Sequence, residues 1–177
     1  DLEGDGQTMF LNAVEYMLHP EPYNVVFVSF HAADDMPSAD AAAAGFTEAA
    51  DVGYTQLLAS NGYNVTRVVT SGSPDPAVMN AADLVIISRS VPSSDYQNAN
   101  ASNWNAIEAP MLILGGYVTR NSRMGFTTGG TMVDTADTIS LTAAKPNHPI
   151  FLDIALDAER MIGRLPWGVE LPLSPFF

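Results

Sequence analysis

Short apolar runs alternate with segments of helical periodicity from residue 6 to residue 116, and this alternation constrains the fold more than any other feature of the sequence. Strands are predicted at 24–30, 63–69, 84–88 and 111–116. Helices are predicted at 6–18, 41–60, 75–82 and 97–108. The run at 24–30 is continuous and rich in β-branched residues, which is typical of a central strand buried on both faces. Three successive strand–helix–strand units predict an α/β fold with a parallel sheet and right-handed crossovers.

The length of 177 residues predicts one domain that spans the whole chain, 1–177. Within it, residues 1–22 form an N-terminal helical segment that could belong to a preceding module. Residues 156–177 form an atypical tail, in which Pro166, Pro172 and Pro175 exclude a long regular helix. An exposed strand is predicted at 138–142, followed by a turn at 145–151.

The charge and composition exclude several classes of partner. Twenty acidic residues oppose seven basic ones, which gives a net charge of -13 and disfavours binding to nucleic acid. The longest apolar runs are too short to cross a bilayer, so no membrane partner is expected. The chain contains no cysteine, which excludes disulfides and a thiolate nucleophile.

The composition also bears on where the protein works. Enrichment in Ala, Asn, Asp, Ser and Thr, with Lys145 the only lysine, is similar to that of exported bacterial proteins. The chain starts at Asp1 rather than Met, which favours removal of an upstream segment, although a trimmed chain is the alternative. We expect a secreted or cell-surface bacterial protein.

Three of the seven basic residues follow apolar runs. Arg89 comes directly after the run at 84–88, and Arg120 and Arg123 follow the run at 111–116. In an open parallel sheet the ligand crevice lies beyond the carboxyl ends of the strands. The scarce positive charge is therefore predicted to gather at a ligand site. The polar loop at 31–40 and the loops after Ser88 and Gly116 are expected to meet there in a common pocket.

Two segments resemble a known superfamily. The run 109–117, Ala-Pro-Met-Leu-Ile-Leu-Gly-Gly-Tyr, resembles the strand and turn that carry the nucleophile in class I glutamine amidotransferase-like domains. The turn 147–150, Asn-His-Pro-Ile, is similar to that of trehalose-utilisation (ThuA-like) members. The resemblance covers residues 24 to 155. It implies a flavodoxin-like three-layer sandwich with a mainly parallel sheet of at least four strands. Tyr117 stands where the family has its nucleophilic Cys, so glutamine hydrolysis by that mechanism is not expected.

The segment 84–92 also resembles secreted bacterial modular proteins of obscure function. In such modules a helix like 7–16 closes the domain instead of opening it. The resemblance therefore implies that the usual last strands are missing. A sheet edge left open in this way would pair with another copy, so a homo-oligomer is expected.

Candidate catalytic groups lie at the ends of the first, third and fourth predicted strands. A hydroxyl nucleophile needs an imidazole base and an orienting carboxylate. Ser88 or Ser90, His31 or His148, and Asp34 or Asp35 could supply these three roles. Arg89, or the backbone N–H groups near Gly115 and Gly116, would meet the developing oxyanion. The Gly-x-Ser-x-Gly elbow of α/β-hydrolases is absent from the sequence.

Each candidate has a structural alternative. His31 could form only a local hydrogen bond, and His148 could cap the segment that follows it. Asp34 and Asp35 could hold Ca²⁺, although the spacing lacks the EF-hand pattern, or they could belong to a solvated loop. Arg89 follows a buried run and is expected to be partly desolvated; it could form an ion pair with either acid. Tyr117 could pack, or it could offer its hydroxyl to substrate.

The leading hypothesis is a hydrolase acting on a small ester, lactone or sugar-derived substrate. The catalytic set is His31, Ser88, Asp34 and Tyr117, with His31 as general base and Ser88 or an activated water attacking. The substrate-binding set is Arg89, Ser90, Gly116, Arg120 and Arg123. We expect no metal and no cofactor, with Ca²⁺ as the exception named above. The alternative hypothesis is a non-catalytic sugar- or anion-binding module of an exported multidomain protein, and the third is a structural or assembly module.

Overall fold

The computed structural model describes residues 4–17, 23–132, 141–156 and 161–162, and it divides into two compact units. One unit is 18–133 and contains the sheet. The other combines 1–17 with 134–177, so it joins the two ends of the chain. The expectation that the chain forms a single domain stays a prediction.

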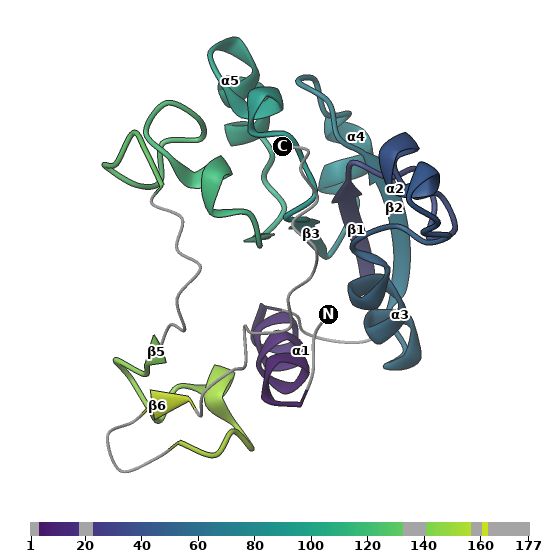
Figure 1. Ribbon diagram of the computed structural model, residues 1–177. Helices are drawn as coiled ribbons and strands as arrows, with labels where there is room; N and C mark the ends of the chain where they lie inside the picture. Colours follow the sequence, from purple (N-terminus) through teal and green to yellow (C-terminus); the bar gives the residue numbers. More distant parts are fainter. Residues whose placement is uncertain (1–3, 18–22, 133–140, 157–160, 163–177) are drawn as a thin grey trace. The chain divides into compact units, whose positions relative to one another are not determined.

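The larger unit is built on a four-stranded sheet in the order β2-β1-β3-β4, and all of its pairings are parallel (Figure 1). The strands are β1 (Asn24–Ser29), β2 (Asn64–Val69), β3 (Leu84–Ile87) and β4 (Met111–Ile113). The central strands β1 and β3 are buried on both faces, as the continuous apolar runs predicted. The predicted α/β class with a parallel, flavodoxin-like sheet is confirmed.

Helices cover both faces of this sheet and make it the middle of three layers. The helical segments are α2 (Ala39–Ala43), α3 (Val52–Ser60), α4 (Pro76–Asn80), α5 (Ala99–Asn105), and the 3-10 turns η1 (Ser93–Tyr96) and η2 (Gly116–Thr119). On one face Met79 of α4 and Trp104 of α5 pack against valines and isoleucines of β1 and β3. On the other face the ring of Phe27 stacks on Tyr54 of α3 at 6.3 Å. Alternate side chains of one strand thus enter different cores.

The predicted helix at 41–60 is wrong, because the structure breaks it into α2 and α3. Gly45 has φ of 91°, and the N–H groups of Gly45 and Phe46 donate to the carbonyls of Ala42 and Ala41. This is the Schellman arrangement that ends a helix. Phe46, an apolar residue inside the predicted helix, is 56% exposed. The break lets the chain return to the sheet at Ala49 and Asp51, both of which are buried.

The smaller unit carries helix α1 (Asp5–Met17), the antiparallel pair β5 (Leu141–Thr142) and β6 (Met161–Ile162), and the 3-10 turn η3 (Pro149–Phe151). The helix expected at 6–18 is confirmed. Most of the strand expected at 138–142, and most of the tail at 156–177, lie outside the described residues.

Among the described residues, no helix combines the length and the apolar character needed to span a bilayer. β2 and β4 are the outer strands of the four-stranded sheet. The pairing of an open sheet edge with another copy stays a prediction.

Candidate functional site

The strand order places a topological switch point between β1 and β3, because the chain moves from β1 to β2 on one side and then to β3 on the other. The carboxyl ends of these two strands are where an open α/β sheet usually receives its ligand. Ser29 ends β1, and Ser88 and Ser90 follow β3. A side chain of the protein occupies this position and binds all three serines.

A buried carboxylate, Asp51 at the start of α3, occupies the switch point. Its Oδ2 accepts hydrogen bonds from the hydroxyls of Ser29 at 2.7 Å, Ser88 at 2.6 Å and Ser90 at 2.7 Å. Its Oδ1 accepts from Nη1 of Arg67 at 2.7 Å. We call these five residues the Asp51 cluster. It ties β1, β2 and β3 to the first turn of α3.

The three serine hydroxyls of this cluster also accept backbone N–H groups. The amide of His31 donates to Ser29 Oγ at 2.9 Å, that of Phe30 to Ser90 Oγ at 3.1 Å, and that of Ser90 to Ser88 Oγ at 3.1 Å. Each hydroxyl therefore gives its single proton to Asp51 and receives a backbone donor. The cluster holds the loops after β1 and β3 in fixed positions and leaves these hydroxyls saturated.

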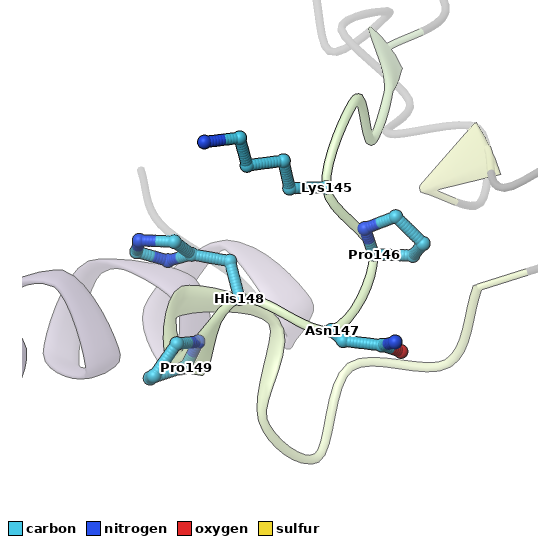
Figure 2. A pocket seen from close by; sticks show the side chains of 5 residues that line it. All are labelled: Lys145, Pro146, Asn147, His148 and Pro149. Carbon is cyan, nitrogen blue, oxygen red and sulfur yellow. The ribbon is translucent and has the colours of Figure 1, made fainter.

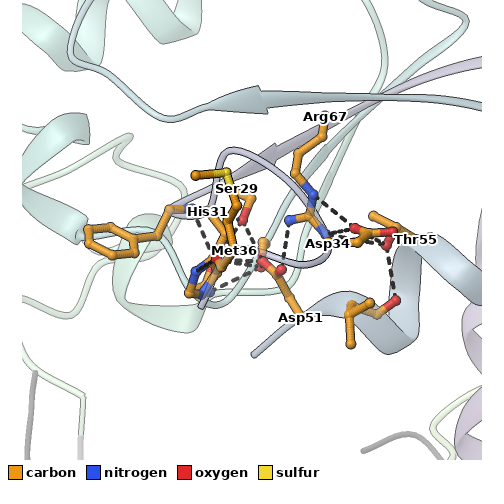
Figure 3. A network of polar contacts seen from close by, with 11 residues as sticks. Ser29, His31, Asp34, Met36, Asp51, Thr55 and Arg67 are labelled. Carbon is orange, nitrogen blue, oxygen red and sulfur yellow. Dashed lines mark hydrogen bonds and ion pairs between the residues drawn. The ribbon is translucent and has the colours of Figure 1, made fainter. Parts of the chain in front are cut away.

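Arg67 balances the charge of the cluster. Its guanidinium lies between two carboxylates, Asp51 and Asp34, and bonds both (Figure 3). The hydroxyl of Thr55 donates to the same Asp34 oxygen at 2.8 Å, and the Arg67 guanidinium carbon lies 5.3 Å from the centre of the Phe27 ring. Arg67 is 8% exposed, so its charge is desolvated and paired.

The pKa of Asp51 lies below its ordinary value although burial alone would raise it. Hydrogen bonds donated by Ser88, Ser90, Arg67 and Ser29 to the carboxylate outweigh the burial. Hydrogen bonds to the charged form favour that form. Asp51 is therefore an anion at neutral pH.

The predicted catalytic residues are held by other partners. Ser88 gives its proton to Asp51, and Asp34 is bound to Arg67. The His31 imidazole is buried, and its Nδ1 lies 3.1 Å from the carbonyl oxygen of Met36, to which it donates (Figure 3). Within the described part of the chain, no hydrogen bond joins this imidazole to a serine hydroxyl or to a carboxylate. The local hydrogen bond considered for His31 is confirmed, and its role as a base stays a prediction.

The expected partial desolvation of Arg89 is wrong, because the residue is exposed. Ser88 turns inward to Asp51, whereas Arg89 lies in the turn that follows β3, where the N–H of Val91 donates to the carbonyl of Ser88 at 3.5 Å. Among the described residues Arg89 has no hydrogen bond or ion pair. The alternative of an ion pair with Asp34 is also wrong, since Arg67 takes that carboxylate.

Predicted Ca²⁺ ligands Asp34 and Asp35 differ in their surroundings. Asp34 is committed to Arg67 and Thr55, whereas Asp35 is exposed. In the part of the chain that the structure describes, no group of three His, Asp or Glu side chains is placed to hold a metal ion.

A second polar cluster lies beyond β3 and β4, where Ser93 of η1 meets two arginines. Nη2 of Arg120 donates to Ser93 Oγ at 3.0 Å, and Nε of Arg123 donates to the same oxygen at 3.4 Å. We call these three residues the arginine cluster. Sequence reasoning identified both arginines as binding residues but missed Ser93.

Neighbouring backbone holds the two guanidinium groups in place. Nε of Arg120 donates to the carbonyl of Tyr117 at 3.0 Å, and its guanidinium carbon lies 5.1 Å from the centre of the Tyr117 ring. Nη1 of Arg123 donates to the carbonyl of Ser122 at 3.0 Å. At Gly116, the methyl group of Met132 comes within 2.9 Å of where a Cβ would lie, so any side chain there would displace Met132.

No carboxylate of the described residues pairs with either arginine, unlike Arg67. The pKa of Arg123 is lowered by partial burial and then by the positive charge of Arg120. The nearby acid on η1, Asp95, accepts instead from the hydroxyl of Thr70 at 3.1 Å. The arginine cluster thus concentrates two positive charges without a counter-ion from the described chain.

Two hollows lie elsewhere. In the smaller unit a shallow pocket of about 370 Å³ is lined by residues 145–149, and Lys145 and His148 extend to the same side of the turn (Figure 2). His148 Nδ1 accepts the N–H of Ile150 at 3.3 Å, which confirms its expected capping role. In the larger unit a groove of about 260 Å³ is lined mainly by apolar side chains, among them Val69, Val78 and Trp104.

The sequence contains a signal for Arg67, although sequence reasoning did not identify Arg67 or Asp51 as part of the site. Arg67 lies in the middle of strand β2 and is followed by two valines, and a charged side chain that becomes buried there needs a partner. Asp51 directly precedes a helix, where an acid is usually interpreted as a cap, but its side chain makes no capping hydrogen bond. Only the tertiary structure shows that Asp51 is that partner.

Comparison with known proteins adds no assignment: no family model, curated protein or solved structure matches the chain. The resemblance to amidotransferase-like domains stays a prediction.

Proposed function

We propose that the chain is a non-catalytic module that binds a small oxyanion through Ser93, Arg120 and Arg123. The observation that carries this proposal is the chemistry of the cluster, in which every free polar group is a donor. Ser93 Oγ already accepts from both guanidinium groups, so its lone pairs are used and its proton is left to donate. Carboxylate and phosphate groups are the usual partners of such an arrangement.

The position of the cluster supports the same proposal. The residues come from the segments that follow β3 and β4, at the edge of the sheet where ligands of open α/β folds bind. The neighbouring switch point is filled by the Asp51 cluster. A ligand would therefore bind beside the switch point rather than in it.

The saturated serines favour a binding module over the hydrolase. A serine nucleophile needs a base to take its proton. The hydroxyls of Ser88 and Ser90 give theirs to the Asp51 carboxylate, whose lowered pKa makes it a weak base. Hydrolysis of small esters or lactones is the competing hypothesis, and membership of an exported bacterial protein stays a prediction.

The test is calorimetric titration of the whole chain with phenyl phosphate and with benzoate at pH 7.5. We expect at least one of these anions to bind, and the double variant Arg120→Gln/Arg123→Gln to lose binding. The matched control is Lys145→Gln, which removes an exposed positive charge of the smaller unit and should bind as the wild type does. Retained binding in the double variant, or loss in Lys145→Gln, would contradict the proposed site.

A parallel assay with short esters and lactones tests the hydrolase. We expect no turnover by the wild type. Turnover that disappears in His31→Ala and Ser88→Ala, with the folded state retained, would overturn the non-catalytic assignment.

A further inference from the structure

We infer that the ligand of the arginine cluster is a dianionic phosphate monoester rather than a carboxylate. The inference rests on the proposed function and adds the class of anion. It is drawn from the charges and the donor groups that Ser93, Arg120 and Arg123 leave without partners among the described residues.

The charge of the cluster matches a dianion. Arg120 and Arg123 are held on one hydroxyl oxygen, and neither has an ion pair with the described residues. Their proximity is unfavourable in the free protein, as the effect of Arg120 on the pKa of Arg123 shows. A carboxylate supplies one negative charge, whereas a phosphate monoester supplies close to two at neutral pH. Only the dianion neutralises both guanidinium groups.

The number of donor groups points the same way. After their bonds within the protein, the hydroxyl proton of Ser93, Nη1 of Arg120 and Nη2 of Arg123 have no acceptor among the described residues. A phosphate monoester presents three strong acceptor oxygens, one for each group. A carboxylate presents two oxygens, so two of the three donors would have to share one oxygen, as the serine donors to Asp51 Oδ2 do, whereas a phosphate gives each donor an oxygen of its own.

The negative charge of the whole protein does not cancel this preference. The net charge of -13 repels every anion, and a dianion most strongly. At physiological ionic strength, however, exposed charges more than about 8 Å apart are largely screened. The two guanidinium groups would touch the ligand and are screened far less. Local charge therefore decides which anion binds, and the overall charge slows its arrival.

The experiment compares three ligands with the same phenyl group. Phenyl phosphate is tetrahedral and becomes a dianion near pH 6, phenyl sulfate has the same shape with one charge, and benzoate is planar with one charge. Titration of the whole chain at pH 7.5 should give an affinity for phenyl phosphate at least about tenfold above the other two. The second negative charge separates it from phenyl sulfate, and that charge together with the third oxygen separates it from benzoate.

The pH dependence separates the dianion from the monoanion. From pH 7.5 to pH 5, the affinity for phenyl phosphate should fall about tenfold, in proportion to the dianion present. Benzoate and phenyl sulfate stay singly charged over this range and report any change in the protein itself. The titratable groups beside the cluster are Asp95 of η1 and Tyr117 of η2, and a change at either would alter the binding of all three ligands.

Variants test the origin of the preference. Arg120→Gln should reduce the phenyl phosphate to phenyl sulfate affinity ratio toward one, because one guanidinium can no longer distinguish the second charge. Ser93→Ala should weaken phenyl phosphate about tenfold through loss of one donor. Lys145→Gln, which removes an exposed positive charge of the smaller unit, should change neither value.

Equal affinity for phenyl sulfate and phenyl phosphate, or a preference for benzoate that depends on both arginines, would overturn the dianion inference and leave the proposed oxyanion site standing. Absence of binding by all three ligands would overturn both.

Discussion

The Asp51 cluster and the arginine cluster lie at the same edge of one sheet, yet they differ in how their charges are balanced. Asp51 is buried and accepts four hydrogen bonds from within the protein. Arg120 and Arg123 are half-buried, and both donate to the Ser93 hydroxyl. Neither forms an ion pair with a carboxylate of the described residues. The contrast teaches that polar residues at strand ends form a ligand site only where the chain leaves them unsatisfied. Where it satisfies them, they hold the fold together.

The largest expected effect is on stability, from Asp51→Asn. The variant keeps the shape of the side chain but removes the charge that balances Arg67 in a buried site. Loss of one member of a buried ion pair usually lowers the free energy of unfolding by about 3 to 5 kcal/mol. We expect the lower end, because Arg67 keeps Asp34. Urea denaturation measures the change.

The matched control is Asp35→Asn, at an exposed acid in the same region of the chain. It should change the free energy of unfolding by less than about 0.5 kcal/mol. A loss below about 1 kcal/mol in Asp51→Asn would remove the structural role assigned to the cluster.

A second, smaller effect is expected on the dependence of stability on pH in the acid range. The native pKa of Asp51 is lowered, so its contribution to stability is complete above the ordinary Asp value of 3.8 and is lost as pH falls through the native value. Denaturation between pH 5 and pH 2 should therefore show a steeper loss of stability in the wild type than in Asp51→Asn. Parallel curves for the two proteins would mean that Asp51 is not held as an anion.

The sequence allowed much of the fold to be predicted, but little of the arrangement of the site. β1 and β3 were predictable because burial on both faces requires continuous apolar runs, which the sequence displays directly. The start of α4 is likewise visible in the sequence, where Asp75 directly precedes Pro76, and Asp75 Oδ1 accepts the N–H of Ala77 at 2.9 Å. Such features depend on neighbours in the chain.

The Asp51 cluster could not be predicted from the sequence, because it consists of residues that are far apart in the chain. Ser29 lies on β1, Arg67 lies on β2 and Ser88 directly follows β3. Asp51 reaches them because Gly45 ends α2 early. A helix expected across 41–60 would have kept Asp51 on its surface. The wrong helix prediction therefore led to a wrong interpretation of the site. Ser88 was interpreted as a nucleophile, whereas its hydroxyl donates a hydrogen bond to the Asp51 carboxylate.

The arginine cluster can be tested by the same measurement of stability, with Arg123→Gln, for which we expect the smallest change in the free energy of unfolding. If the arginine cluster is a ligand site, the folded state does not depend on its charge, and the free energy of unfolding should stay within about 0.5 kcal/mol of wild type. Any change should be a gain at low salt, because the substitution removes repulsion from Arg120. Added salt should shrink that gain, since it screens the repulsion. Thermal unfolding at two salt concentrations measures both effects. A loss above about 1 kcal/mol would show that Arg123 is as structural as Asp51, and the contrast between the two clusters would fail.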